Sequence, residues 1–440
     1  MLISELTSIS RSKNLNRQII ISFFLKFFSL SLGLLIIPKT LGILGSNQYG
    51  VWLTILSIVS WLVTFDVGIG NGLRNKLAES LAIDDYESSC KYISTGYFSL
   101  TIISLFIMVI VSLIIPFVNW TVVFNTVSIN NEELKKTMFV ISIAVLVNFI
   151  IIIVNQIMNA FQKAAYTNFV SILHSSFFLI ILLVIKDIHD LYTVTKFYSL
   201  SLVLSGLVVS FFFYRTNFNY IPKIKWIDLS KAKEILQLGG SFFIIQIATV
   251  FMFSTSSILI IQLLSSIDVS IYNVTFRLFS TLSLVFSIVV TPYWSAFTEA
   301  FKKSDFKWIK TSMVKLHVYL ALTIIIAILL VISHQFILDL WLGKNKLIPG
   351  FTVALMMGVY VIILSWSNIY SHYLNGIGKL KMQTILAVIQ AIMVIPLCFL
   401  FTKFLNMGLS GIMLSLIFSL LPFAIIGPIV SIKSLKSINV

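Results

Sequence analysis

Long apolar runs separated by short polar loops make up most of this chain. A helix needs about 20 apolar residues to cross a hydrocarbon core about 30 Å thick, and runs of that length recur from end to end. We predict an all-α membrane protein with about twelve transmembrane helices, near residues 18–37, 50–70, 93–117, 138–159, 168–185, 194–213, 238–263, 270–293, 314–333, 350–370, 382–402 and 408–430.

Composition supports a membrane protein. Of the 440 residues, 58% are hydrophobic and only 11% are charged, whereas soluble proteins average roughly 25% charged residues. The first apolar run carries no small-residue cleavage site, so we expect an uncleaved first span. The two cysteines, Cys90 and Cys398, are too far apart for a metal motif and do not indicate a disulfide framework.

The net charge of +15 would suggest nucleic acid as the partner of a soluble protein. Here the basic residues are concentrated in short loops between the apolar runs, for example Arg74 and Lys76 after the second span and Lys223 and Lys225 before the seventh. Basic loops mark the cytoplasmic side of a membrane protein. We therefore predict that both termini are cytoplasmic and that the chain has no nucleic-acid partner.

The spans are predicted to form two halves of six. Residues 159–163 (Asn-Ala-Phe-Gln-Lys) close the fourth span, and 375–379 (Asn-Gly-Ile-Gly-Lys) close the tenth, 216 positions later; Glu79 and Glu299 are 220 apart. Because six is even, both halves enter the membrane in the same direction, which predicts a parallel repeat about a pseudo-two-fold axis. We expect an N-terminal lobe at 1–213, a cytoplasmic linker at 214–237 and a C-terminal lobe at 238–440.

Three charged residues lie deep inside predicted spans, namely Lys26, Asp66 and Arg277, whereas Lys196 and Lys315 lie at span edges. A charge at the centre of a membrane helix costs about 2.5–3.5 kcal/mol on insertion scales, so such residues are usually paired, face a watery cavity or carry function. Lys26 and Asp66 lie at similar depths and could form an ion pair. Alternatively, Asp66 is a titrating carboxylate, or one that binds H+ or Na+, and acts as a switch because its protonation changes the energy with which one lobe packs on the other.

Lys26 is also a candidate for lining a substrate cavity, together with Arg277, Arg74, Asn148 and Asn155. Arg277 suits a phosphate-bearing ligand, since guanidinium keeps its charge, but interfacial snorkelling explains it equally well. Arg74, at the inner mouth, could meet an anionic headgroup or could simply orient the protein. Asn148 and Asn155 share a face of the fourth span, where amides either line a hydrated path or hydrogen-bond between helices.

Signatures of catalysis are sparse. The glycines at 68, 70 and 72 follow a predicted helix with no strand before them, which excludes a dinucleotide-binding loop and favours a flexible or closely packed helix end. The five histidines are scattered and form no metal motif. We predict no enzyme, no cofactor and no metal site.

Residues 47–52 (Asn-Gln-Tyr-Gly-Val-Trp), 65–68 (Phe-Asp-Val-Gly), 72–79 and 291–300 resemble polysaccharide biosynthesis membrane proteins, specifically Wzx-type O-antigen flippases. The resemblance implies the fold of the multidrug/oligosaccharidyl-lipid/polysaccharide exporter superfamily, with two six-helix lobes in alternating access. It implies an undecaprenyl-diphosphate-linked oligosaccharide as the substrate, moved from the cytoplasmic to the outer leaflet. It further implies contact with membrane lipids, with a polysaccharide polymerase and with a chain-length regulator.

Two rival functions stay open on the sequence. A small-molecule or drug cation antiporter shares the architecture, but usually needs acidic residues in its cavity, and this chain has one intramembrane Asp against two firm bases. A polysaccharide polymerase is the enzyme alternative, and it needs a long outer loop for its active site. The outer loops here are short, the longest lying near 119–137.

Overall fold

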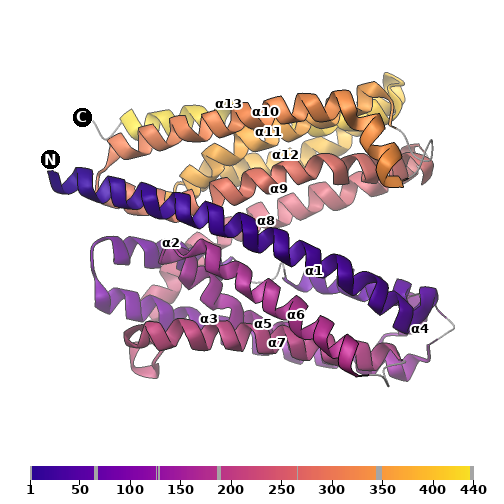
Figure 1. The fold of residues 1–440 in the computed structure, drawn as a ribbon, viewed down its shortest axis with the longest axis horizontal. Helices are drawn as coiled ribbons and strands as arrows, with labels where there is room; N and C mark the ends of the chain where they lie inside the picture. The colour runs from indigo at the N-terminus through magenta and orange to yellow at the C-terminus, as the bar shows by residue number, and fades with distance from the viewer. Residues whose placement is uncertain are drawn as a thin grey trace. The chain divides into compact units, whose positions relative to one another are not determined.

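The computed structural model describes residues 2–63, 68–124, 126, 129–185, 190–264, 266–342 and 349–436. All regular secondary structure in these ranges is helical (Figure 1). The predicted all-α architecture is therefore confirmed.

The first half of the chain contains a very long first helix and a bundle. The elements are α1 (Leu2–Val63), α2 (Ile69–Ala82), α3 (Tyr86–Ile114), η1 (Ile115–Phe117), α4 (Trp120–Val123), α5 (Asn131–Ala160), η2 (Ala164–Thr167), α6 (Asn168–Val184) and α7 (Leu191–Thr216). α1 is kinked at Gly45, whose φ of 67° lies in the left-handed region that glycine tolerates. The kink separates the first predicted span from the second.

The second half repeats long helices. Two short helices, η3 (Phe218–Tyr220) and η4 (Ile224–Trp226), lead into α8 (Leu229–Leu263), α9 (Ser266–Lys302), α10 (Phe306–Leu342), α11 (Phe351–Gly376), α12 (Lys381–Phe399), the π-helical turn η5 (Leu400–Phe404) and α13 (Gly408–Lys436). Pro396 lies inside α12, and its missing N–H removes a helical hydrogen bond just before the chain widens into η5.

Ten helices in the described part of the chain are long and apolar enough to cross a membrane, and each overlaps a different one of the twelve predicted spans. The other two predicted spans are 50–70, which includes the undescribed residues 64–67, and 238–263, which lies in α8 and has side chains that the structure describes only in part.

The chain is divided into two compact units. One is Lys13–Phe243, and the other combines Met1–Ser12 with Ile244–Val440. The start of α1 thus belongs to the unit that contains α9 to α13, while the start of α8 belongs to the unit that contains α2 to α7. Each unit has its own apolar core, around Leu73 and Ile157 in the first and around Phe279 and Tyr360 in the second. The lobe boundaries given above stay a prediction for the membrane-embedded parts.

The repeat predicted from the sequence is visible in the turns. α5 ends with hydrogen bonds from Lys163 N to Met158 O and from Gln162 N to Asn159 O, and α11 ends with the same bonds 216 positions later, in which Lys379 N donates to Leu374 O. Both are helix ends with a left-handed residue, Gln162 (φ 56°) in one and Gly378 (φ 70°) in the other. A second turn recurs at an offset of 220, with left-handed residues Asp84 and Ser304.

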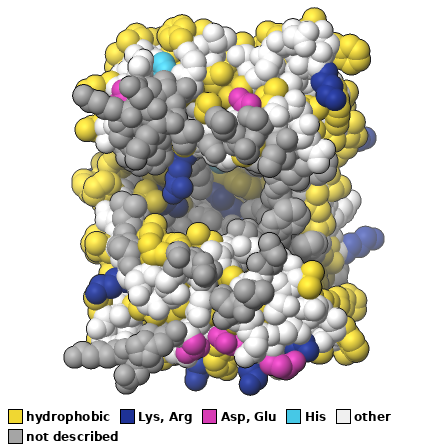
Figure 2. Space-filling view, turned by 90° about the vertical axis from the view of Figure 1, so that its right-hand side faces the viewer, with side chains coloured by type: hydrophobic (Ala, Val, Ile, Leu, Met, Phe, Trp, Pro, Cys, Tyr) yellow, Lys and Arg dark blue, Asp and Glu magenta, His cyan; other side chains and the backbone are white. Residues whose placement is uncertain are grey.

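Large apolar side chains lie on the outer faces of the helices. Phe106 and Leu113 of α3 and Ile325 and Ile332 of α10 are all exposed, and hydrophobic side chains lie along the left and right edges of the view in Figure 2. Soluble monomers rarely expose contiguous apolar patches beyond a few hundred Å². These faces therefore fit contact with lipid chains.

Candidate functional site

The glycines at the start of α2 bring this helix against the start of α8. A Cβ at Gly72 would lie 2.4 Å from the carbonyl oxygen of Ile235, and one at Gly68 would lie 2.1 Å from that of Gly239. No side chain fits at such distances. Of the two interpretations given above, a flexible or a closely packed helix end, these distances support the closely packed one.

Arg74 lies in α2 between core residues Leu73 and Leu77, and only 3% of it is exposed. A guanidinium keeps its charge even when buried, so polar groups must satisfy it. Arg74 therefore lies in the packed interior and not in an open loop, and its role as a substrate contact stays a prediction.

Asn148 and Asn155 lie on α5. Asn148 is buried where Gly206 of α7 comes close, since a Cβ at Gly206 would lie 2.7 Å from Ile151 and 3.3 Å from the Asn148 Oδ1. In the described part of the chain neither amide oxygen accepts a hydrogen bond. Buried polar atoms are normally bonded to protein or water. The arrangement fits a hydrated seam along α5, within the first unit.

Lys26 is half-buried in α1, on the helix face that also carries Ser22, Ser29 and Gly33. The opposite face presents the exposed rings of Phe23, Phe24, Phe27 and Phe28. The lysine thus points away from the most apolar surface of its helix. Asp66, its predicted partner, lies outside the described residues, so the ion pair stays a prediction.

Arg277 is exposed on α9. The hydroxyl groups that follow on its face donate to their own helix: Ser280 to the Arg277 carbonyl, and Ser287 to the Leu284 carbonyl. The oxygen atoms of these hydroxyls can still accept a hydrogen bond, but their protons are already donated to the helix. Lys26 and Arg277 belong to different compact units, and each is described within its own unit.

An ionic cluster that the sequence did not reveal surrounds Arg11. Its Nη1 lies 2.8 Å from the Asp305 Oδ2 and its Nε lies 3.3 Å from the Glu299 Oε2. The guanidinium also lies 4.7 Å from the centre of the Trp308 ring, whose N–H donates to the Ser12 hydroxyl at 3.0 Å. Nothing in the sequence around Arg11 singles it out from the other basic residues near the N-terminus. No local signal could identify partners almost 300 residues away.

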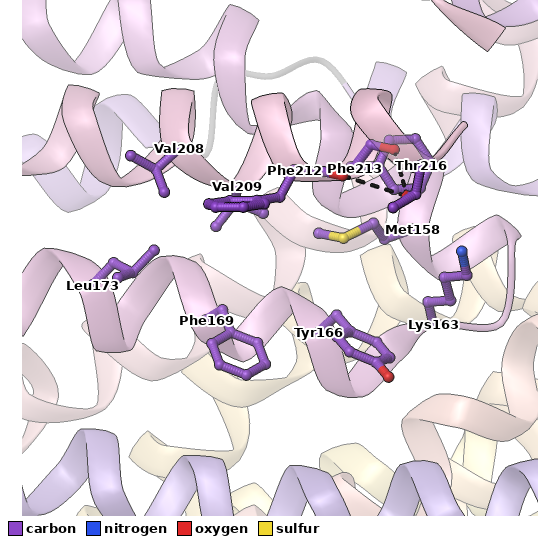
Figure 3. Close-up of a pocket in the computed structure, with 10 residues that line it drawn as sticks. All are labelled: Met158, Lys163, Tyr166, Phe169, Leu173, Val208, Val209, Phe212, Phe213 and Thr216. Atoms are coloured by element: carbon purple, nitrogen blue, oxygen red, sulfur yellow. Dashed lines mark hydrogen bonds between the residues drawn. The ribbon is translucent and has the colours of Figure 1, made fainter. Parts of the chain in front are cut away.

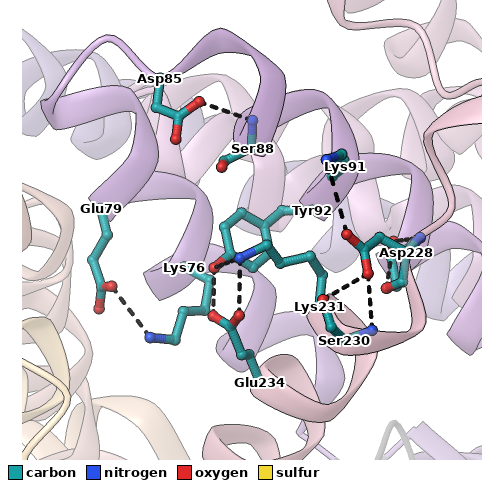
Figure 4. Close-up of polar contacts among 11 residues, drawn as sticks. Lys76, Glu79, Asp85, Ser88, Lys91, Tyr92, Asp228, Ser230, Lys231 and Glu234 are labelled. Atoms are coloured by element: carbon teal, nitrogen blue, oxygen red, sulfur yellow. Dashed lines mark hydrogen bonds and ion pairs between the residues drawn. The ribbon is translucent and has the colours of Figure 1, made fainter.

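The start of α8 is held by a similar cluster in the other unit (Figure 4). Lys231 Nζ lies 2.9 Å from the Glu234 Oε1, and its ammonium also lies 5.0 Å from the centre of the Tyr92 ring. The Tyr92 hydroxyl donates to Glu234. Lys91 pairs with Glu87 at 2.7 Å and approaches Asp228 at 4.0 Å.

Hydrogen bonds in this region lower the pKa of three carboxylates, those of Asp85, Asp228 and Glu234. The pKa of Asp228 is lowered from its ordinary value because the hydroxyl and backbone N–H of Ser230 donate to the charged form. The pKa of Asp85 is lowered in the same way by Ser88 at the start of α3. Burial raises the pKa of Glu234, but the hydrogen bonds from Tyr92 and Lys231 outweigh it and the net shift is downward. All three carboxylates are charged at neutral pH.

A third group joins histidine and aromatic residues of α10 and α11. The Nδ1 of His317 lies 2.6 Å from the Met313 carbonyl oxygen and donates to it, and Nε2 lies 2.9 Å from the Tyr370 hydroxyl, from which it accepts in the neutral form of the ring. The Trp366 ring lies 5.4 Å from His317, and its N–H donates to the Ala424 carbonyl. The sequence gave no sign of this group, because its members are about 50 residues apart.

The described residues contain no group of three His, Cys, Asp or Glu side chains that could hold a metal ion. What they contain is buried polar atoms in long apolar helices and basic side chains within or beside predicted spans. Polar atoms of this kind can hydrogen-bond to a polar ligand or to water.

Comparison with known proteins identifies the family. Residues 15–297, more than half of the chain, match the family described as polysaccharide biosynthesis protein. The chain belongs to the polysaccharide biosynthesis protein family. The resemblance noted from the sequence motifs is thereby confirmed.

Relatives of this polysaccharide biosynthesis protein match nearly end to end. A protein of Yersinia pseudotuberculosis, whose name assigns it to O-antigen export, is 24% identical over 410 residues, which cover 91% of this chain and 90% of the relative. A protein of Salmonella typhi, named as an O-antigen transporter, is 23% identical over 400 residues, which cover 86% of this chain and 87% of that relative. Both names denote transporters, which agrees with our prediction that the chain is not an enzyme.

A solved structure establishes the fold class. An outward-facing multidrug resistance MATE family transporter of the MOP superfamily superposes with a TM-score of 0.78 at 15% identity, covering 98% of this chain and 97% of the other. At this identity the match speaks for the fold alone. The chain is thus a multi-pass bacterial membrane protein with a two-lobe, all-helical fold.

Proposed function

We propose that this protein is a flippase that moves undecaprenyl-diphosphate-linked oligosaccharide repeat units, of an O-antigen or similar polysaccharide, from the cytoplasmic to the outer leaflet. The observation that carries the proposal is the match along about nine-tenths of the chain to a protein named for O-antigen export. The transporter fold supports it.

The physical task explains why a protein is needed. Each sugar hydroxyl costs several kcal/mol when it enters an alkane-like medium without a hydrogen bond, and a diphosphate costs more. Unaided flipping is therefore very slow. A hydrated cationic path shields the headgroup, while the polyprenyl tail stays in the bilayer.

Within this proposal Lys26 and Arg277 attract the diphosphate or an acidic sugar. Lys26 is half-buried on the polar face of α1 and Arg277 is exposed on α9, so neither is consumed by an ion pair within the described residues. Asn148 and Asn155 contribute to a hydrated seam, Arg74 supports the inner end, and Asp66 acts as the switch that couples movement to H+ or Na+.

The cell biology follows from the substrate. Undecaprenyl-linked repeats are assembled on the cytoplasmic face, so we place the protein in the cytoplasmic (inner) membrane with both termini inside. It delivers its cargo to a polysaccharide polymerase and a chain-length regulator on the other side.

The direct test is to delete the gene and measure where lipid-linked repeat units accumulate. They should collect on the cytoplasmic face, and wild-type protein should restore export. In the same assay Lys26→Ala and Arg277→Ala should each slow translocation roughly tenfold, because a hydrogen bond to a charged group contributes about 1.5–3 kcal/mol.

Lys26→Arg keeps the charge and should retain most of the activity, while Lys315→Ala, an exposed position on α10, is the matched control. Unchanged translocation in both alanine variants, at equal protein levels, would show that these two residues do not bind the headgroup. Normal distribution of repeat units after deletion would overturn the flippase itself.

The fold match to a multidrug transporter favours one alternative, a drug or cation antiporter. Purified protein in liposomes separates the two. Cation uptake driven by an ion gradient, without movement of a fluorescent lipid-linked sugar, would favour the antiporter.

A further inference from the structure

An apolar groove opens on the surface of the first unit between α6 and α7 (Figure 3). Its volume is about 610 Å³. Phe169 and Leu173 line it from α6, Val209 and Phe212 line it from α7, and Met158 of α5 contributes to the lining. Phe212 is 59% exposed, so the groove lies on a face that meets lipid.

Lys163 lies at one end of this groove. Its ammonium lies 5.7 Å from the centre of the Phe213 ring and 5.9 Å from that of Phe161. In the described part of the chain no carboxylate comes within salt-bridge distance of Lys163. A half-buried cation beside aromatic faces, without an acidic partner, is ready to receive an anion.

The lysine lies at the membrane boundary. The span that contains α6 begins at Ala164, directly after Lys163, and the span of α7 ends at Thr216. The groove thus runs from the interface into the hydrocarbon layer. Tyr220 packs on Phe161 at 5.0 Å, which connects Lys163 to the segment that carries the exposed Lys223 and Lys225.

We propose that this groove binds one anionic phospholipid of the adjacent leaflet, with an acyl chain between α6 and α7 and the phosphate on Lys163. The apolar lining suits the chain, and the unpaired ammonium supplies charge complementarity. Basic pockets between transmembrane helices are typical binding sites for anionic lipid headgroups. The volume falls in the range of about 300–1,000 Å³ that holds one small ligand, which favours a single acyl chain over a long polyprenyl tail.

The test uses full-length protein exchanged into detergent with equal amounts of phosphatidylglycerol and phosphatidylcholine, followed by native mass spectrometry. Wild type should retain phosphatidylglycerol in preference. Lys163→Gln should lower its apparent affinity about fivefold, which corresponds to about 1 kcal/mol for one lysine at a membrane surface. A phosphatidylglycerol with a photoreactive acyl chain should label α6 and α7.

Lys379→Gln is the matched control, because Lys379 ends the same turn in the other half of the repeat and is exposed; it should bind lipid as wild type does. Val208→Trp, which fills the groove, should reduce photolabelling without removing the lysine.

Equal retention by wild type and Lys163→Gln, or labelling confined to other helices, would overturn the proposal. Stronger retention of undecaprenyl phosphate than of phosphatidylglycerol would show that the occupant is a polyprenyl lipid. None of these outcomes depends on which sugar the protein transports.

Discussion

Arg11 carries a charge that its surroundings must neutralise, because its side chain is only 2% exposed. Glu299 and Asp305 supply two carboxylates and Trp308 supplies a ring face. The Asp305 carboxylate also accepts from the backbone N–H of Trp308 at the start of α10. One guanidinium thus joins the first residues of the chain to the turn between α9 and α10.

Arg11→Ala should lower the free energy of unfolding by about 3 kcal/mol, because removing one member of a buried ion pair leaves the other charges without their partner. Thermal melting in detergent measures the loss. Arg17→Ala is the control, since Arg17 is exposed on the same helix, and it should melt as wild type does. Equal melting of the two variants would show that the Arg11 cluster contributes little.

At the scale of elements, the contact between α2 and α8 depends on two glycines, Gly68 and Gly72, which have no side chains to keep the helices apart. Gly68 and Gly72 let the backbone of α2 touch the carbonyls of Ile235 and Gly239. Small residues at a helix interface allow such close approach inside membranes. The contact places the start of α8 in the unit that contains α2 to α7.

Gly72→Leu should therefore destabilise the protein by about 2 kcal/mol or more, since overpacking forces backbone shifts. Gly240→Ala is the matched control on α8, because a Cβ there meets nothing within 4 Å. A helical Gly to Ala change at such a site should be neutral or stabilising by up to about 1 kcal/mol. Thermal melting compares the two, and a stable Gly72→Leu variant would contradict the close contact.

At the scale of the whole molecule, the two compact units exchange the starts of two helices. Met1–Ser12 belongs to the unit with Ile244–Val440, and the residues of α8 up to Phe243 belong to the unit with α2 to α7. The start of α1 therefore belongs to one unit and the rest of α1 to the other, and α8 is divided between the units in the same way. The backbone between Ser12 and Lys13, and again between Phe243 and Ile244, passes from one unit to the other.

This exchange predicts that a chain cut between η3 and η4 stays assembled. Fragments 1–221 and 222–440, expressed together, should co-purify through a tag on either one, because α8 packs on α2 whether or not the chain is continuous between η3 and η4. The same pair carrying Gly72→Leu should separate more readily in detergent. Separation of the unmodified fragments would contradict the exchange.

The sequence predicted the spans well because each depends on a local property. Length and hydropathy of an uninterrupted run decide whether a helix can cross a membrane, so ten helices of the described chain overlap predicted spans. The repeat was also predictable, since the turns that end α5 and α11 are built from neighbouring residues. For the candidate site the sequence located Lys26, Arg74, Asn148, Asn155 and Arg277 by their unusual polarity, but not their surroundings.

The sequence by itself determined the membrane class, the spans, the repeat and the motifs of the family, because each of these depends on residues that are close together in the chain. Only the tertiary structure decided which distant groups meet: Arg11 with Glu299 and Asp305, Gly72 with Ile235, and Lys163 with the groove between α6 and α7. The physical reason is that local sequence shows only that a buried charge, or a glycine without a side chain, needs a neighbouring group. Which group lies next to it depends on how distant segments fold together within each unit.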